Sequence, residues 1–277
     1  MSLSLDAPRP FGLRQHLICL QGIVWRESLR FLHQRERFVS ALVRPLVWLF
    51  IFAAGFRQTL GISIIPPYET YILYEVFITP GLMAMIQLFN GMQSSLSMVY
   101  DREMGSMRML LVSPAPRWFL LTSKLIAGVA VSILQVYAYL VIAWFWDIEP
   151  PTWWGYLTVL PALALSGLML GALGMVLSSL IKQLENFAGV MNFVIFPMFF
   201  ASSALYPLWR VREGSPWLAT VCQLNPFTHA VELIRFAFYQ KIEPTSLAIV
   251  IGCTIVFLAA AVFAYDPARG MLMRRGG

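Results

Sequence analysis

The chain alternates long apolar runs with short polar segments. Residues 76–100 and 125–146 contain no charged side chain, and four further apolar runs cover residues 38–56, 157–181, 186–206 and 245–265. A hydrocarbon core about 30 Å thick is crossed by roughly 20 residues of helix. The pattern therefore predicts an all-α integral membrane protein with six transmembrane helices at these positions.

A segment before the first span, residues 11–37, has helical periodicity. Its apolar positions recur on one face, at Leu13, Leu17, Leu20, Val24 and Phe31. Its cations lie on the other face, at Arg26, Arg30 and Arg37. We expect this helix to lie in the membrane interface, with an amphipathic helix packed on a soluble partner as the alternative.

The second and third runs are joined by a polar segment, residues 101–124. It begins with acidic and basic residues at Asp101–Glu103, and it continues through Gly105 and an apolar stretch that contains Arg108. Pro114 and Pro116 then end that stretch, because proline cannot continue a helix. The pattern predicts a short amphipathic helix at the membrane surface that could receive force from a partner.

Polar positions inside the spans have two interpretations. Asn90 and Gln93 in the second span could bond across helices or line a substrate route. Arg44 is expected at the cytoplasmic edge of the first span, where its side chain can reach the interface. The Gly167-xxx-Gly171 pattern favours close helix packing within the chain over a dimer contact.

The stretch 207–243 precedes the last span. Asn225-Pro226 opens an apolar run at 227–239, which is too short to cross a bilayer and is therefore interpreted as re-entrant or interfacial. Glu232 and Arg235 are three residues apart and could neutralise each other. His229 is expected to be a hydrogen-bonded structural histidine, with a site residue as the alternative.

Composition and charge agree with a membrane protein. The 277 residues are 58% hydrophobic and 12% charged, far from the balance of soluble domains. With the N-terminus inside, fifteen Lys and Arg residues fall on the cytoplasmic side and five outside. This places both termini in the cytoplasm and explains the basic character without nucleic acid. The start of the chain lacks the pattern of a cleaved signal peptide, and the three cysteines are interpreted as packing residues.

Candidate chemistry is sparse. The sequence has no phosphate-binding loop, no paired metal-ligand spacing and no nucleophile elbow. We therefore expect no catalytic residues, no metal and no cofactor bound by this chain. An ion-coupled secondary transporter and a membrane-embedded enzyme of lipid or cofactor metabolism remain as alternatives, although both normally need more buried charge or a cluster of acids and histidines.

Several motifs together resemble the permeases of ABC-2 type transporters. They are Pro80–Met85, Asp101–Ser106, Leu110–Pro114 with Arg117, Phe199–Ser203 and Asn225–His229. Their order against six apolar runs covers nearly the whole chain, from Phe11 to Tyr265. The chain departs from the family at Ser202-Ser203-Ala204, where Ser-Gly is frequent, which leaves the local bend there open.

The resemblance implies a single membrane domain of the type V exporter kind over residues 1–277, with two short re-entrant helices before the last span. It implies a homodimer of permeases with two separate ATPase subunits that bind ATP-Mg, in a bacterial inner membrane. The substrate would be an amphiphile such as a drug, a lipid-linked glycan or a lipid. Heterodimer and direction of transport stay open.

The resemblance also implies roles for individual residues. Coupling to the ATPase is assigned to Arg26, Arg30, Arg37, Arg102, Glu103, Gly105, Ser106, Arg108, Pro114 and Arg117. Candidates for the pathway or dimer interface are Trp48, Phe89, Asn90, Gln93, Asn192, Phe193 and Pro197. The external re-entrant segment is represented by Asn225, Pro226, His229, Glu232 and Arg235.

Overall fold

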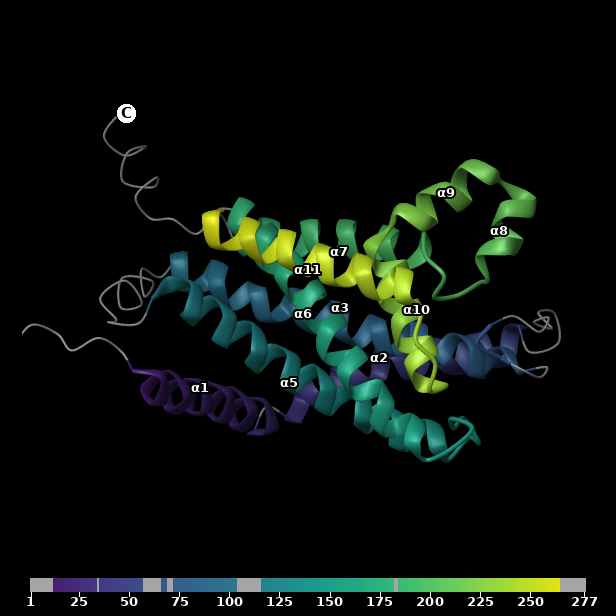
Figure 1. Ribbon diagram of the computed structural model, residues 1–277, viewed down its shortest axis with the longest axis horizontal. Helices are drawn as coiled ribbons and strands as arrows, with labels where there is room; N and C mark the ends of the chain where they lie inside the picture. The colour runs from purple at the N-terminus through teal and green to yellow at the C-terminus, as the bar shows by residue number, and fades with distance from the viewer. Residues whose placement is uncertain are drawn as a thin grey trace, which may run out of the picture.

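The chain is described by a computed structural model. The residues it describes are 12–33, 35–56, 66–68, 72–103, 116–181 and 184–264. Long helices run side by side along the longest axis of the molecule, and shorter helices gather at one end (Figure 1). The helices are α1 (Leu13–His33), α2 (Arg35–Phe56), α3 (Tyr74–Glu103), α5 (Arg117–Trp144), α6 (Trp154–Leu180), α7 (Leu184–Phe200), α8 (Leu208–Gly214), α9 (Pro216–Leu224), α10 (Pro226–Phe238) and α11 (Pro244–Ala264).

Three of the described helices are long and apolar enough to cross a membrane. They cover Trp118–Trp144, Trp154–Leu180 and Pro244–Ala264. Shorter apolar helical stretches occur at Leu42–Ile51 in α2 and Gly189–Phe200 in α7. The chain is therefore a mostly helical membrane protein, as the apolar pattern predicts.

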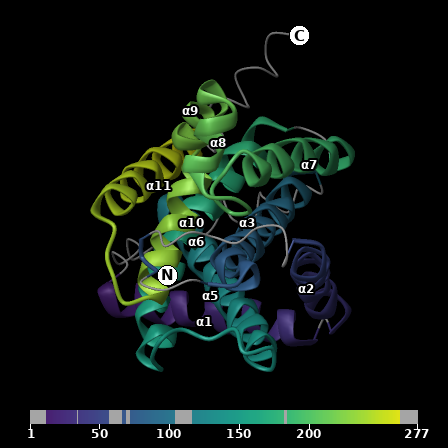
Figure 2. The same ribbon diagram turned by 90° about the vertical axis from the view of Figure 1, so that its right-hand side faces the viewer.

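Helix α3 forms the centre of the core. It packs against α2, α5, α6, α7 and α10 (Figure 2). Its residues from Phe77 to Asn90 are therefore all buried. Because a helix surrounded by neighbours has no solvent or lipid face, its apolar residues need no helical periodicity. This agrees with the run of consecutive apolar residues in the sequence.

Glycines allow α3 and α6 to approach closely. A Cβ atom built on Gly91 would lie 2.9 Å from the Cα of Gly171, and one on Gly174 would lie 2.9 Å from the Gly91 carbonyl oxygen. Only a residue without a side chain fits at such a distance. A Cβ on Gly171 would also meet Leu125 of α5 at 2.5 Å. The prediction that this small-residue face packs within the chain is confirmed.

The helices begin and end somewhat away from the apolar runs. Arg37 lies in α2, which starts at Arg35, whereas the sequence placed it on the interfacial helix. Arg117 is the first residue of α5, so it belongs to a helix and not to a connecting loop. Hydrogen bonding along a helix does not stop where hydrophobic residues stop, which explains why charged residues occupy the helix ends.

Three short helices, α8, α9 and α10, fill the segment between α7 and α11, where every residue is described. The resemblance implied two. The break between α8 and α9 falls at Ser215, whose backbone is extended, and Pro216 begins α9 because it lacks the N–H that a continuing helix would need. The three helices lie at one end of the molecule (Figure 1).

Candidate functional site

One face of the molecule is shared by α2, α3 and α7, where aromatic rings meet. Trp48 of α2 lies edge-on to Phe199 and Phe200 of α7, with ring centres 5.9 and 5.7 Å apart. Phe89 of α3 packs edge-on against Phe196 of α7 at 6.4 Å. The structure therefore brings two predicted pathway residues, Trp48 and Phe89, into one aromatic cluster on neighbouring helices.

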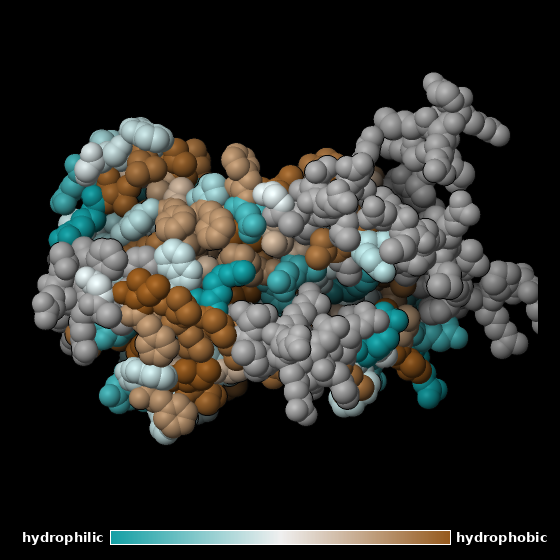
Figure 3. Space-filling model, turned by 180° about the vertical axis from the view of Figure 1, so that it is seen from behind, coloured by the Kyte–Doolittle hydropathy of each residue, from teal (hydrophilic) through white to brown (hydrophobic). Residues whose placement is uncertain are grey.

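The outer part of this face is exposed and apolar. Phe193 on α7 is 79% exposed, and Asn192 and Pro197 on the same helix are also exposed. On α2, Val43, Val47, Phe50 and Ile51 are exposed as well. Seen from behind, this side of the molecule carries many hydrophobic side chains, with a few hydrophilic ones near its middle (Figure 3).

A polar pocket adjoins the aromatic cluster between α2, α3 and α5. Its polar lining comes from Arg44, Asn90, Gln93 and Gln135. The Asn90 side-chain nitrogen donates to the Gln135 side-chain oxygen at 2.8 Å, which ties α3 to α5. The Arg44 guanidinium carbon lies 3.8 Å from the centre of the Phe89 ring. Asn90 thus makes the bond across helices that its sequence position suggests, and Asn90 and Gln93 also line a cavity.

The structure brings Arg44 to this pocket and adds Gln135, which the sequence did not single out. Arg44 was expected at the cytoplasmic edge, yet it is the tenth of the 22 residues of α2 and reaches toward the middle of α3. Gln135 was not considered, although it is the only carboxamide in the run 125–146. A lone amide in an apolar span was the available signal, because such a group needs a partner.

Asn225 anchors the start of α10 to the end of α7. Its side-chain nitrogen donates to the carbonyl oxygens of Met198 and Ala201, each at 2.7 Å. Its side-chain oxygen accepts from the Phe227 N–H at 3.0 Å, and Pro226 occupies the first helical position. This is the arrangement of an N-cap residue followed by proline. Asn225 and Pro226 therefore position α10 against the end of α7.

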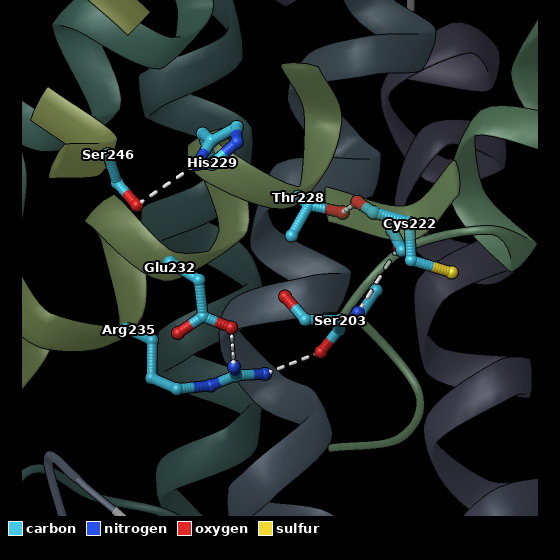
Figure 4. A network of polar contacts seen from close by, with 9 residues as sticks. Ser203, Cys222, Thr228, His229, Glu232, Arg235 and Ser246 are labelled. Carbon is cyan, nitrogen blue, oxygen red and sulfur yellow. Dashed lines mark hydrogen bonds and ion pairs between the residues drawn. The ribbon is translucent and has the colours of Figure 1, made fainter. Parts of the chain in front are cut away.

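Arg235 is the most buried cation among the described residues. Its guanidinium forms an ion pair with Glu232 and donates to the Ser203 carbonyl oxygen at 2.7 Å (Figure 4). It also lies over the Phe77 ring of α3, 4.3 Å from the ring centre. The predicted pairing of Glu232 with Arg235 is confirmed. The Arg235 guanidinium therefore joins α10 to α3 and to the turn after α7.

Both ring nitrogens of His229 lie within hydrogen-bond distance of other groups. Nε2 lies 2.9 Å from the Gln223 carbonyl oxygen, which can only accept, so Nε2 carries the proton. In the neutral ring, Nδ1 then accepts from the Ser246 hydroxyl at 3.3 Å (Figure 4). The two contacts hold α10 to its neighbours, which favours the structural interpretation of this histidine.

The predicted coupling residues fall mostly at helix ends or outside the described residues. Gly105, Ser106, Arg108 and Pro114 lie outside them. Arg102 and Glu103 are in the last turn of α3 and Arg117 is in the first turn of α5, while Arg30 and Arg37 are in α1 and α2. Arg26 is exposed on α1, next to Trp25, which is 66% exposed.

Within the described parts of the chain, no group of three or more His, Cys, Asp or Glu residues is placed to hold a metal ion. The buried polar side chains there include the amides of Gln87, Asn90 and Gln135, several hydroxyls, Glu75 and Arg235.

Comparison with known proteins gives the family. A model of the ABC-2 type transporter family matches residues 19–239. The transport permease ycf38 of Cyanophora paradoxa is 28% identical over 204 residues, which are 72% of this chain and 67% of that protein. The corresponding permease of Porphyra purpurea is 24% identical over 242 residues, 85% of this chain and 79% of that protein.

A multidrug ABC transporter permease, YbhR of Escherichia coli (strain K12), is also similar. It is 29% identical over 171 residues, which are 61% of this chain and 45% of that protein. The family match extends from α1 to the C-terminal end of α10 and therefore includes both the aromatic cluster and the external segment. The chain belongs to the ABC-2 type transporter family and is a multi-pass membrane permease.

Proposed function

We propose that this chain is the permease subunit of an ATP-binding cassette exporter and forms the substrate pathway, while separate ATPase subunits bind ATP-Mg and hydrolyse it. The observation that carries the proposal is the face shared by α2, α3 and α7. There Trp48, Phe89, Asn90 and Gln93 come together beside exposed apolar residues. A second permease copy packed against this face would enclose a pathway between the two subunits.

Six spans are assigned to α2, α3, α5, α6, α7 and α11, with both termini in the cytoplasm of a bacterial inner membrane. The end of α3 and the starts of α1 and α5 lie at one end of the molecule, opposite α8 and α9 (Figure 1). The excess of Lys and Arg falls on the end with α1, which supports its cytoplasmic placement. The α8–α10 segment is then external.

Two ATPase subunits would contact two permease copies through α1 and the segment 101–124. Support comes from the packing of α1 on α5, where His16 lies edge-on to Phe119 at 4.7 Å. A movement imposed on α1 would therefore reach α5 directly. The exposed residues Leu17, Ile18 and Trp25 of α1 fit a helix in contact with lipid headgroups.

An amphiphile is the substrate class that this face suits best, whether a drug, a lipid-linked glycan or a lipid. Aromatic rings offer an apolar surface to a hydrocarbon portion, and the adjacent amides offer hydrogen bonds to a polar portion. The similarity to a permease named for multidrug transport agrees with this class.

The first test is affinity purification of the tagged chain from solubilised native membranes, with its partners identified by mass spectrometry. We expect an ATPase with nucleotide-binding motifs in roughly equimolar amount. The purified complex, reconstituted in vesicles, should then move an amphiphile only when ATP-Mg is present. Recovery of the chain alone, stable and active without an ATPase, would instead support an ion-coupled transporter or a membrane-embedded enzyme.

A further inference from the structure

Arg44 places a positive charge near the middle of a helix assigned to the membrane. It is the tenth residue of the 22-residue helix α2. A charge at the centre of a membrane helix costs about 2.5–3.5 kcal/mol on insertion scales. Among the residues that the structure describes, no carboxylate lies within ion-pair distance of Arg44, in contrast to Arg235, which is paired with Glu232.

The surroundings of Arg44 compensate this charge only in part. Its guanidinium lies 3.8 Å from the centre of the Phe89 ring, and such a cation–π contact stabilises a cation by roughly 0.5–2 kcal/mol. The pocket beside it has a volume of about 60 Å³, which is enough for more than one water molecule. The site therefore holds a cation next to free space.

Hydrogen-bond donors surround that space. Gln135 uses its side-chain oxygen to accept from Asn90, which leaves its amide hydrogens directed away from that bond. Gln93 adds a second carboxamide to the lining, and Arg44 supplies a fixed fork of N–H groups. Among the lining residues that the structure describes there is no acid, and a guanidinium with neighbouring amides is a donor set that recognises a phosphate or a carboxylate.

The pocket borders an apolar surface on one side. Phe89, which stacks under Arg44, also contacts Phe196 of α7, and Trp48 of α2 contacts Phe200. Both flanking helices lie on the same side of α3 (Figure 2). An occupant with an anionic group at Arg44 would therefore have aromatic side chains beside its hydrocarbon portion.

We propose that the pocket lined by Arg44, Asn90, Gln93 and Gln135 binds the anionic group of an amphiphile, with Arg44 as its counter-ion. The inference rests on the proposed permease function and narrows its substrate class to amphiphiles that carry a phosphate or a carboxylate. The anionic group supplies a negative charge that Arg44 does not receive from any carboxylate among the described residues.

The test measures equilibrium binding of radiolabelled dodecyl phosphate to the full-length protein in phosphatidylcholine nanodiscs, after subtraction of uptake by empty nanodiscs. Dodecanol serves as the uncharged probe. We expect Arg44→Gln to weaken binding of dodecyl phosphate about tenfold or more. Arg44→Lys should retain most of the affinity, and binding of dodecanol should not change in either variant.

Arg210→Gln is the matched control. Arg210 also lies over an aromatic ring, that of Trp209 at 5.5 Å, but on the external helix α8. Its removal should leave binding of dodecyl phosphate unchanged. Addition of phosphatidylglycerol to the nanodiscs identifies the source of the anion. Competition with dodecyl phosphate means that a membrane lipid can fill the site, and lack of competition means that the site selects other anionic amphiphiles.

Equal affinity of wild type and Arg44→Gln for dodecyl phosphate would overturn the inference. So would a wild-type protein that binds dodecanol as tightly as dodecyl phosphate. Dissociation of a dimer by Arg44→Gln, seen by light scattering without a change in probe selectivity, would assign Arg44 to the subunit interface and overturn it as well. Co-purification of the ATPase is measured on the same preparations, so that failure of anion binding is distinguished from failure of the permease assignment.

Discussion

The guanidinium of Arg235 on α10 lies over the ring of Phe77 on α3, with 4.3 Å between the guanidinium carbon and the ring centre. The same guanidinium pairs with Glu232 and donates to the Ser203 carbonyl oxygen. The side chain of Arg235 is 3% exposed and that of Glu232 is 21% exposed. One buried cation thus fixes α10 to the core helix α3.

Arg235→Gln should therefore destabilise the protein. Removal of one partner from a buried ion pair costs about 3–5 kcal/mol of stability. We expect the lower end of this range, because the Glu232 side chain is 21% exposed and stays partly hydrated. Thermal unfolding of the purified protein in one detergent should show a fall of roughly 6–12 °C. Glu232→Gln should cost less, since Arg235 keeps the Ser203 carbonyl and the Phe77 ring. Equal losses in both variants would contradict this ranking.

Gly91→Val should prevent the close contact between α3 and α6. The new side chain would meet the backbone of Gly171, which cannot move aside as a flexible side chain can. Overpacking of this kind costs about 1–3 kcal/mol. Size-exclusion profiles and melting temperatures provide the measurement. Gly252→Val on α11 is the control, because nothing lies within 4 Å of a Cβ built there. A normal melting temperature for Gly91→Val would show that the two helices can separate without cost.

Glu243 should make the stability depend on pH. Burial alone would raise the pKa of this carboxyl, but hydrogen bonds from Ser246 and Thr245 at the start of α11 lower it below the ordinary value of 4.5. A carboxyl with a lowered pKa in the folded state stabilises the protein above the unfolded-state pKa. The contribution is lost as the pH falls through 4.5 and toward the folded-state pKa.

The expected loss is about 1 kcal/mol, the scale of a helix-capping interaction. It is measured as the difference in melting temperature between wild type and Glu243→Gln at about pH 7 and about pH 3. The two proteins should differ at the higher pH and converge at the lower one. A difference that stays constant over this range would show that the charge of Glu243 is not involved.

Charge reversal on either side of the segment proposed to contact the ATPase should separate ATP hydrolysis from transport. Glu103→Arg and Arg117→Glu change residues at the ends of α3 and α5, on either side of the segment assigned to the ATPase contact. We expect ATP hydrolysis by the reconstituted complex to continue while transport falls about tenfold, a loss of about 1.4 kcal/mol in coupling. Arg212→Glu on external α8 is the matched charge reversal and should transport normally. Full transport by both loop variants would contradict the assignment.

The sequence predicted features that depend on neighbours along one helix. The pairing of Glu232 with Arg235 required only a spacing of three residues, and it is present. Gly167 and Gly171 required only a small-residue pattern, and both are buried against other helices of the chain. In each case, the information lay within about one or two turns of helix.

Features that depend on how helices meet were not predictable in the same way. Arg44 was expected at the edge of its span because a charged side chain is least costly there, and hydropathy does not tell which neighbouring helix the side chain faces. The guanidinium of Arg44 lies over the ring of Phe89, which belongs to another helix. Likewise, Gln135 becomes part of the pocket only because α5 packs beside α3, which brings it within reach of Asn90.

The glycine contacts between α3 and α6 also bear on how the protein can move. Backbones in direct contact leave no room for sliding, so α3 and α6 form a rigid unit to which α5 is also packed. Helix α7 meets α3 through the rings of Phe196 and Phe89, and α2 meets α3 where the Arg44 guanidinium lies over the Phe89 ring. Side chains of this kind can change rotamer without breaking a backbone contact. A cycle of opening and closing would thus have a fixed frame, and α2 and α7 would be its moving walls.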